Sequence, residues 1–196
     1  GVPGTVAGLI ETHEKYGKLS LKEILRPVIN QAKKGITVSY DLNQAIGSAR
    51  QIALDLGSSQ IYLKDGSPVP EHSRMARENL AWTITEIANK GHKAFYEGSI
   101  AKKIVQAMEE NDGYISAADL KEYRPRFSEP IQTSYRGFKV FAHPPPAGGA
   151  AVVLESLNIL ENFSVEEMGP YSAQFLHVFA EALQRGHMDR SRFMGD

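Results

Sequence analysis

The stretch that decides the fold is His143-Pro-Pro-Pro-Ala-Gly-Gly-Ala-Ala-Val-Val-Leu-Glu-Ser-Leu-Asn-Ile-Leu-Glu-Asn-Phe163. Three consecutive prolines keep the backbone extended, because each ring fixes φ near about −65° and removes an amide donor. The glycine pair Gly148-Gly149 follows, and apolar residues then recur at helical spacing. The stretch therefore predicts a rigid extended connector that turns directly into a helix over residues 150–160.

Helical periodicity also dominates the rest of the chain. Two pairs, Ser20 with Glu23 and Ser116 with Asp119, have the spacing of a capping box at a helix start. Pro27 lies inside one apolar stripe, and we expect it to kink that helix or to mark its true start. The predicted helices lie at about 3–16, 20–34, 39–56, 75–90, 99–112, 116–123 and 172–193.

Extended segments are few. Residues 60–64 predict a short strand before the turn Asp65-Gly66. Residues 131–134 and 138–142, separated by Tyr135-Arg136-Gly137, predict a β-hairpin. We therefore expect an α+β fold that is mainly helical with a small β-hairpin. We find no internal repeat and assign no domain boundary within residues 1–196.

Composition excludes several classes of protein. The 196 residues carry 22 basic and 23 acidic side chains, so the basic surface that nucleic-acid binding requires is absent. The sequence contains no cysteine, which rules out disulfides, thiolate catalysis and Cys-ligated zinc within it. No apolar run approaches the roughly 20 residues that cross a bilayer, so we predict no membrane segment. Nothing in the sequence indicates a cofactor.

Three features toward the C-terminus are candidates for binding. The amides of Gly148 and Gly149 at a helix start have the geometry that holds an anion, although a tight strand-to-helix turn is the more ordinary interpretation. The proline triplet 144–146 is more typical of a rigid connector than of a partner-binding segment. Asp189 and Arg190 are interpreted first as a structural ion pair near a helix C-terminus, and second as groups that reach an active site.

Other polar and aromatic residues have weaker claims to function. His177 and Glu181 share a helix face, and His187 lies close to Asp189, but no His-Glu-x-x-His pattern is present. Surface or capping roles are the more ordinary explanation, so we predict no metal site. Trp82 is expected to be a core or interface aromatic. None of the six threonines, Thr5 included, has the sequence context of a nucleophile.

Four segments together carry a resemblance to a known family. Each is common alone, and their order and spacing along the chain make the combination specific. They are Gly1-Val2-Pro3-Gly4-Thr5-Val6-Ala7-Gly8, Pro144-Pro145-Pro146 with Gly148-Gly149, Leu157-Asn158-Ile159-Leu160-Glu161, and Asp189-Arg190-Ser191 with Gly195-Asp196. The whole chain resembles the large-subunit part of the gamma-glutamyltranspeptidase family.

This resemblance implies a fragment of an αββα N-terminal-nucleophile hydrolase. Members of the family are precursors that cleave themselves before a threonine, which then begins the small subunit. Its hydroxyl attacks a gamma-glutamyl amide, as in glutathione, with its own α-amine as the base. The implied partners are the small subunit, or the remainder of the precursor, and a gamma-glutamyl substrate. The implied location is periplasmic or extracellular.

The resemblance assigns no catalytic residue to this chain. The family's nucleophile lies in a Thr-Thr-His type motif, and its substrate-carboxylate arginine in an Arg-Glu-Thr-Ala-Pro type motif. Neither motif occurs in residues 1–196, so we expect these residues alone to be inactive. Where many relatives have Ser-Ser-Gly-Gly after the prolines, this chain has Ala147-Gly148-Gly149-Ala150, which lacks two hydroxyls.

Two alternatives stay open. The first is a fragment of another enzyme of the same superfamily, either a cephalosporin or glutaryl acylase or a depolymerase of poly-gamma-glutamate capsule. The second is a non-catalytic helical interaction domain, which would bury its apolar side chains by itself. A large exposed apolar surface favours the fragment over the interaction domain.

Overall fold

The chain forms two units, residues 1–126 and residues 127–196. The computed structural model describes residues 1–194 and, at Arg50, the backbone alone, so Gly195-Asp196 of the last family segment lies outside the described residues. The helices are α1 (Thr5–Tyr16), α2 (Leu21–Lys34), α3 (Tyr40–Ser48), the 3-10 helix η1 (Arg50–Ala53), α4 (Leu56–Tyr62), α5 (Glu78–Lys90), α6 (His92–Tyr96), α7 (Ser99–Glu110), α8 (Ala117–Glu122), α9 (Gly148–Leu160) and α10 (Ala173–Phe193).

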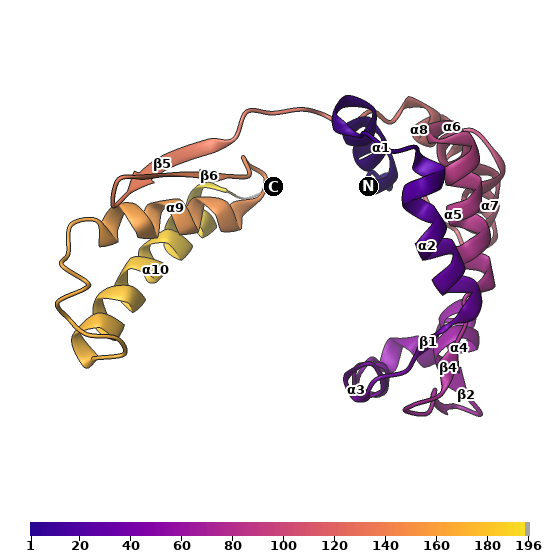
Figure 1. The fold of residues 1–196 in the computed structure, drawn as a ribbon, viewed down its shortest axis with the longest axis horizontal. Helices are drawn as coiled ribbons and strands as arrows, with labels where there is room; N and C mark the ends of the chain where they lie inside the picture. Colours follow the sequence, from indigo (N-terminus) through magenta and orange to yellow (C-terminus); the bar gives the residue numbers. More distant parts are fainter. Residues whose placement is uncertain (195–196) are drawn as a thin grey trace. The chain divides into compact units, whose positions relative to one another are not determined.

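The first unit is built from helices joined by short connections (Figure 1). The capping box of α2 forms as predicted, because the Ser20 hydroxyl accepts from Glu23 N and the Glu23 carboxylate accepts from Ser20 N. The capping box at Ser116 also forms, at the start of α8. Pro27 lies inside α2, which begins earlier at Leu21, so Pro27 does not mark the helix start.

Three strand pairs accompany the helices, and all are antiparallel. β1 (Ile36–Thr37) pairs with β4 (Arg74–Met75), and β2 (Leu63–Lys64) pairs with β3 (Ser67–Pro68) around the predicted turn at Asp65. β5 (Ile131–Tyr135) and β6 (Phe138–Ala142) form the predicted hairpin. The observed fold is therefore mainly helical with small strand pairs, as the sequence indicates.

Some predicted elements are wrong. The helix expected over 39–56 ends at Ser48, and Leu56 begins a separate helix, α4, that includes Gly57. The strand expected over 60–64 is helical up to Tyr62 and extended only after it. Met75 belongs to β4 rather than to the helix that follows, because it pairs with Ile36 across the chain. Such long-range pairing overrides the local apolar period.

The core of the first unit forms around a buried tyrosine. The Tyr96 side chain is 1% exposed and packs with Ala7, Ala101 and Leu120. Its hydroxyl donates to Pro3 O at 2.7 Å and accepts from Ala7 N at 3.1 Å. Because the N-cap of α1 is a glycine with no side-chain hydrogen bond, the Tyr96 hydroxyl satisfies an amide that the helix leaves unpaired.

The second unit has three layers. Figure 1 shows α9 lying between the β5–β6 hairpin and α10, and the contacts of α9 with both neighbours agree. The helices approach closely where Gly186 of α10 faces Val152, because a β-carbon at Gly186 would lie 3.1 Å from the Val152 Cα. The buried Ser156 hydroxyl donates to Ala182 O at 3.3 Å across the same interface.

We predict that Tyr96→Phe destabilises the first unit by about 1–3 kcal/mol, because it leaves the buried Ala7 amide and the part-buried Pro3 carbonyl without their partner. The measurement is urea unfolding followed by the fluorescence of Trp82, the only tryptophan in the sequence. The control is Tyr114→Phe, since Tyr114 is 98% exposed and should change the free energy of unfolding little. Equal effects of the two substitutions would contradict the proposed role of the hydroxyl.

Candidate functional site

The loop that follows β6 delivers the chain to the start of α9. The peptide bond between Pro145 and Pro146 is cis, and α9 begins at Gly148. The N-cap residue Ala147 makes no side-chain hydrogen bond to the helix. The first turn of α9 therefore presents backbone amides without a side-chain cap, which is an electrostatic environment that favours negative charge.

Arg190 of α10 lies against this helix start. A β-carbon at Gly148 would be only 2.8 Å from Nε of Arg190 and 3.1 Å from its Cδ. A glycine is therefore needed at residue 148 if the arginine is to keep this position. The structure thus brings together Gly148 and Arg190, which lie far apart in the sequence.

A pair of carboxyl groups lies on the same two helices. Burial, together with the charge and hydrogen bonding of Asp189, raises the pKa of the half-buried Glu155. Glu155 belongs to α9 and Asp189 to α10, so the pair spans the helix interface. Asp189 interacts with this glutamate, whereas the sequence suggested an ion pair with the neighbouring Arg190. Among residues 1–194, Glu181–Arg185 is the ion pair found within α10.

The groups at this site have the chemistry to bind an anion. A guanidinium beside uncapped helix amides favours a carboxylate or another anion. Nucleophilic catalysis needs a hydroxyl or a thiol beside a base. Gly148, Arg190, Glu155 and Asp189 carry no hydroxyl and no thiol.

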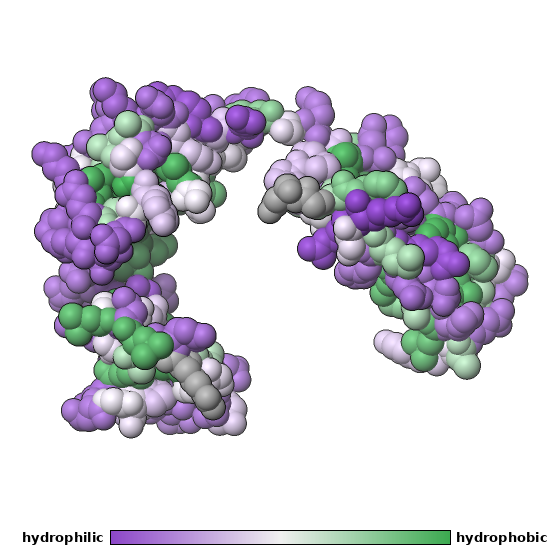
Figure 2. Space-filling view, turned by 180° about the vertical axis from the view of Figure 1, so that it is seen from behind, coloured by the Kyte–Doolittle hydropathy of each residue, from purple (hydrophilic) through white to green (hydrophobic). Residues whose placement is uncertain are grey.

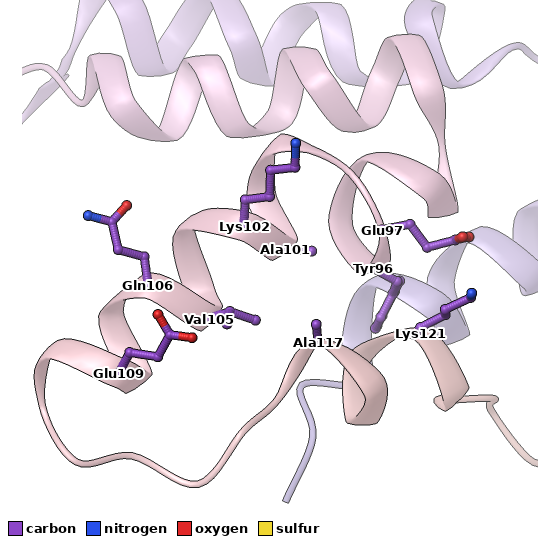
Figure 3. Close-up of a pocket in the computed structure, with 9 residues that line it drawn as sticks. All are labelled: Tyr96, Glu97, Ala101, Lys102, Val105, Gln106, Glu109, Ala117 and Lys121. Atoms are coloured by element: carbon purple, nitrogen blue, oxygen red, sulfur yellow. The ribbon is translucent and has the colours of Figure 1, made fainter.

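A second hollow lies between α6, α7 and α8 in the first unit. Its volume is about 450 Å³, and Tyr96, Ala101, Val105 and Ala117 provide its apolar lining. Figure 3 shows Glu97 and Lys121 at one end and Gln106 and Glu109 at the other. Burial raises the pKa of the Tyr96 phenol, and its oxygen is occupied by two backbone groups. The tyrosine is therefore not free to act as an acid or a base.

Of the remaining candidates, Glu181 and Trp82 have structural partners. His177 and Glu181 lie on one face of α10, and Arg185 pairs with Glu181 at 2.6 Å. Within residues 1–194 no group of three or more His, Cys, Asp or Glu side chains is arranged to hold a metal ion. Trp82 is 39% exposed and lies beneath the Lys103 ammonium.

Over residues 1–194, no helix combines the length and the apolar composition that a membrane span needs.

The threonine hydroxyls give no sign of a nucleophile. Four of the six are hydrogen bonded to protein acceptors, and three of these donate to the carbonyl four residues earlier in the same helix. The pairs are Thr12 with Gly8 O, Thr83 with Asn79 O, Thr85 with Ala81 O, and Thr133 with the Asn158 amide oxygen. Thr5 lies at the first position of α1 and is exposed.

Comparison with known proteins decides the family. The family model described as Gamma-glutamyltranspeptidase matches residues 1–196. The chain belongs to the gamma-glutamyltranspeptidase family. It is 36% identical over 198 residues to the glutathione hydrolase proenzyme of Pseudomonas sp. (strain A14), covering 100% of this chain and 34% of that protein. It is also 34% identical to the acylase ACY 1 proenzyme of Pseudomonas sp. (strain V22), covering 97% of this chain and 34% of that protein.

The fold agrees with the sequence comparison. The crystal structure of the Helicobacter pylori gamma-glutamyltranspeptidase superposes with a TM-score of 0.95 at 32% identity, covering all of this chain and 57% of that chain. Against the two proenzymes, the chain spans about a third of the relative's length. The resemblance found in the four sequence segments is thereby confirmed, and so is the expectation of a part of a larger fold.

The family segments occupy defined places in this gamma-glutamyltranspeptidase fold. The Val2-Pro3-Gly4-Thr5 segment is held by the Tyr96 hydroxyl and covered by Tyr123, whose hydroxyl oxygen would lie 2.1 Å from a β-carbon at Gly4. In the segment at Asp189 and Arg190, Arg190 lies beside Gly148 at the start of α9, and Asp189 interacts with Glu155 in the middle of α9. The sequence assigned no role to Tyr96 or to Glu155, because a single Tyr or Glu in a helical stripe carries no distinctive spacing.

We predict that Glu155→Gln strengthens the α9–α10 pairing at neutral pH. The raised pKa means that the folded unit holds the proton more tightly than the unfolded chain. Stability is therefore greatest below the ordinary pKa of glutamate and falls as pH rises through the folded-state value. Glutamine removes the charge, so amide-exchange protection factors in α9 and α10 should become higher at pH 7 and change less between pH 4 and 7.

The matched control is Glu167→Gln, in the exposed loop between the two helices, which should leave the protection factors of α9 and α10 unchanged. Lower protection at pH 7 in Glu155→Gln would show that the glutamate charge stabilises the interface and would overturn this prediction.

Proposed function

We propose that residues 1–196 form part of the large subunit of an enzyme that hydrolyses or transfers gamma-glutamyl groups. The observation that carries the proposal is the match along the whole chain to the gamma-glutamyltranspeptidase of Helicobacter pylori, in sequence and in fold. The substrate class follows from that family and comprises glutathione and related gamma-glutamyl amides. The polypeptide to which these residues belong is called the parent polypeptide below.

In this proposal, residues 1–196 position the catalytic parts and supply no catalytic group. The resemblance assigns the nucleophile to a threonine that self-cleavage turns into a new amino terminus, and no threonine here has that context. The bonded hydroxyls of Thr12, Thr83 and Thr85 support this view, because each is engaged within its own helix. The partner is therefore the small subunit, or the remainder of the same precursor.

A second candidate is favoured by the match to the acylase ACY 1 proenzyme, at an identity close to that of the glutathione hydrolase. The two classes of substrate differ at one group. A gamma-glutamyl donor carries an α-ammonium beside its carboxylate, whereas a glutaryl donor has the carboxylate alone. A gamma-glutamyl enzyme therefore needs a partner for the ammonium, and a glutaryl acylase does not.

We predict that the self-cleaved parent polypeptide releases p-nitroaniline from gamma-glutamyl-p-nitroanilide, and that residues 1–196 alone release none. The reason is that an acyl transfer of this kind needs a hydroxyl with an adjacent base. The absorbance of p-nitroaniline measures both rates under identical conditions.

The control substrate is glutaryl-p-nitroanilide, which lacks only the α-amine. A faster reaction with the glutaryl compound would replace the proposed function by the acylase alternative. Release of p-nitroaniline by residues 1–196 alone would contradict the assignment of the nucleophile to another part of the parent polypeptide.

A further inference from the structure

An apolar groove runs between three helices of the first unit. Its volume is about 520 Å³, and its lining residues come from α1, α2, α5 and the α1–α2 connection. The lining includes Leu9, Tyr16, Ile24 and Ile84, and it contains no carboxylate, ammonium or guanidinium group. We call this surface the α1–α2–α5 groove.

The groove leaves the apolar side of α2 incompletely covered. Leu21, Ile24, Leu25, Val28 and Ile29 follow one face of α2, yet no residue of this helix is buried. The side chain of Ile24 is 43% exposed and that of Val28 is 44% exposed. An amphipathic helix of a globular protein normally turns such a stripe toward a core, so the stripe indicates a missing neighbour.

α1 contributes exposed apolar side chains to the same groove. Leu9 is 66% exposed and Tyr16 is 66% exposed, although both lie in the middle or last turns of a well-formed helix. Figure 2 shows hydrophobic residues reaching the surface of both units among hydrophilic ones. In the first unit the groove concentrates such residues from the consecutive helices α1 and α2, beside Ile84 and Ile87 of α5.

We propose that the α1–α2–α5 groove receives the apolar face of a helix from a part of the parent polypeptide outside residues 1–196. This inference rests on the proposed function, in which these residues belong to a larger precursor. The matched proenzymes offer the length that is needed, because this chain spans only about a third of each. An occupant in the same polypeptide needs no separate association step.

The apolar lining of the groove favours the apolar face of a helix as its occupant. The polar side chains of the lining are Thr12, His13 and Tyr16, of which Thr12 is bonded to Gly8 O and His13 Nε2 to Leu19 O. The lining has no carboxylate, so the ammonium of a gamma-glutamyl compound would lose its hydration there without gaining an ionic partner. The lining residues lie almost entirely on helices, whose backbone groups are bonded internally, so the occupant cannot bind by adding a strand to a sheet edge. Apolar side chains presented at helical spacing match these requirements.

The test places a photo-reactive benzoylphenylalanine at Leu9 of the parent polypeptide. The matched control has the same substitution at Leu54, which is 86% exposed and outside the groove. Purified light and isotopically heavy copies are mixed before irradiation, so that adducts within one copy and between two copies have different masses. Peptide mapping then identifies the segment joined to each position.

We expect the Leu9 variant to give, at several-fold higher yield than the Leu54 variant, an adduct within one copy to a peptide outside residues 1–196. Equally low yields at the two positions would overturn the proposal, because they would show that nothing covers the groove. An adduct to residues 1–196 of the same copy, or to a second copy, would overturn it as well, since the occupant would then be a different one.

Two further measurements keep the outcomes separate. Circular dichroism of both variants checks that the helices persist, and Tyr16 offers a second position in the groove if the Leu9 variant does not fold. Turnover of gamma-glutamyl-p-nitroanilide by the unmodified parent polypeptide tests the proposed function on its own. An active enzyme without the expected adduct refutes the inference alone, whereas the adduct in a polypeptide without turnover refutes the proposed function alone.

Discussion

The first unit depends on one buried hydroxyl. Tyr96 joins the carbonyl of Pro3 to the amide of Ala7, and so ties the segment that enters α1 to a helix some ninety residues away in the sequence. Gly4 is needed beside it because the ring of Tyr123 leaves no space for a side chain. Because its N-cap is Gly4, α1 has no side-chain cap. The Tyr96 hydroxyl, from α6, accepts the hydrogen bond of the Ala7 amide instead. The packing of Tyr96 and Tyr123 therefore gives a physical reason for the glycine in the Val2-Pro3-Gly4-Thr5 segment.

The second unit depends on close approach between two helices. Gly186 lets the α10 backbone reach Val152, and the resulting contact places Asp189 and Arg190 against α9. The same contact that holds the helices together therefore brings the Arg190 guanidinium to the start of α9 and the Asp189 carboxyl to Glu155 in the middle of α9. Burial, together with the charge and hydrogen bonding of Asp189, raises the pKa of Glu155, so the ionised glutamate lowers the stability of the interface as the pH rises through that pKa.

Local signals in the sequence predicted the local structure. The capping boxes at Ser20 and Ser116, the hairpin before His143 and the start of α10 at Ser172 all depend on residues within a few positions of one another. The break after Ser48 and the pairing of Met75 with Ile36 were missed, because they depend on contacts between distant segments. For the same reason the sequence pointed to Gly148 and Arg190 separately, and did not indicate that they touch or that Glu155 faces Asp189.

The distribution of side-chain size argues that these helices belong to a larger assembly of polypeptide. The buried hydrophobic residues of the described region include many alanines, such as Ala7, Ala81 and Ala94, whereas Leu9, Ile24 and other large apolar side chains are exposed. A domain that folds for itself gains most by burying the large side chains, since burial of apolar area is the main favourable contribution. Here the alanines allow the helices to approach one another, and the large side chains stay exposed, as expected if the proposed occupant of the α1–α2–α5 groove packs against them.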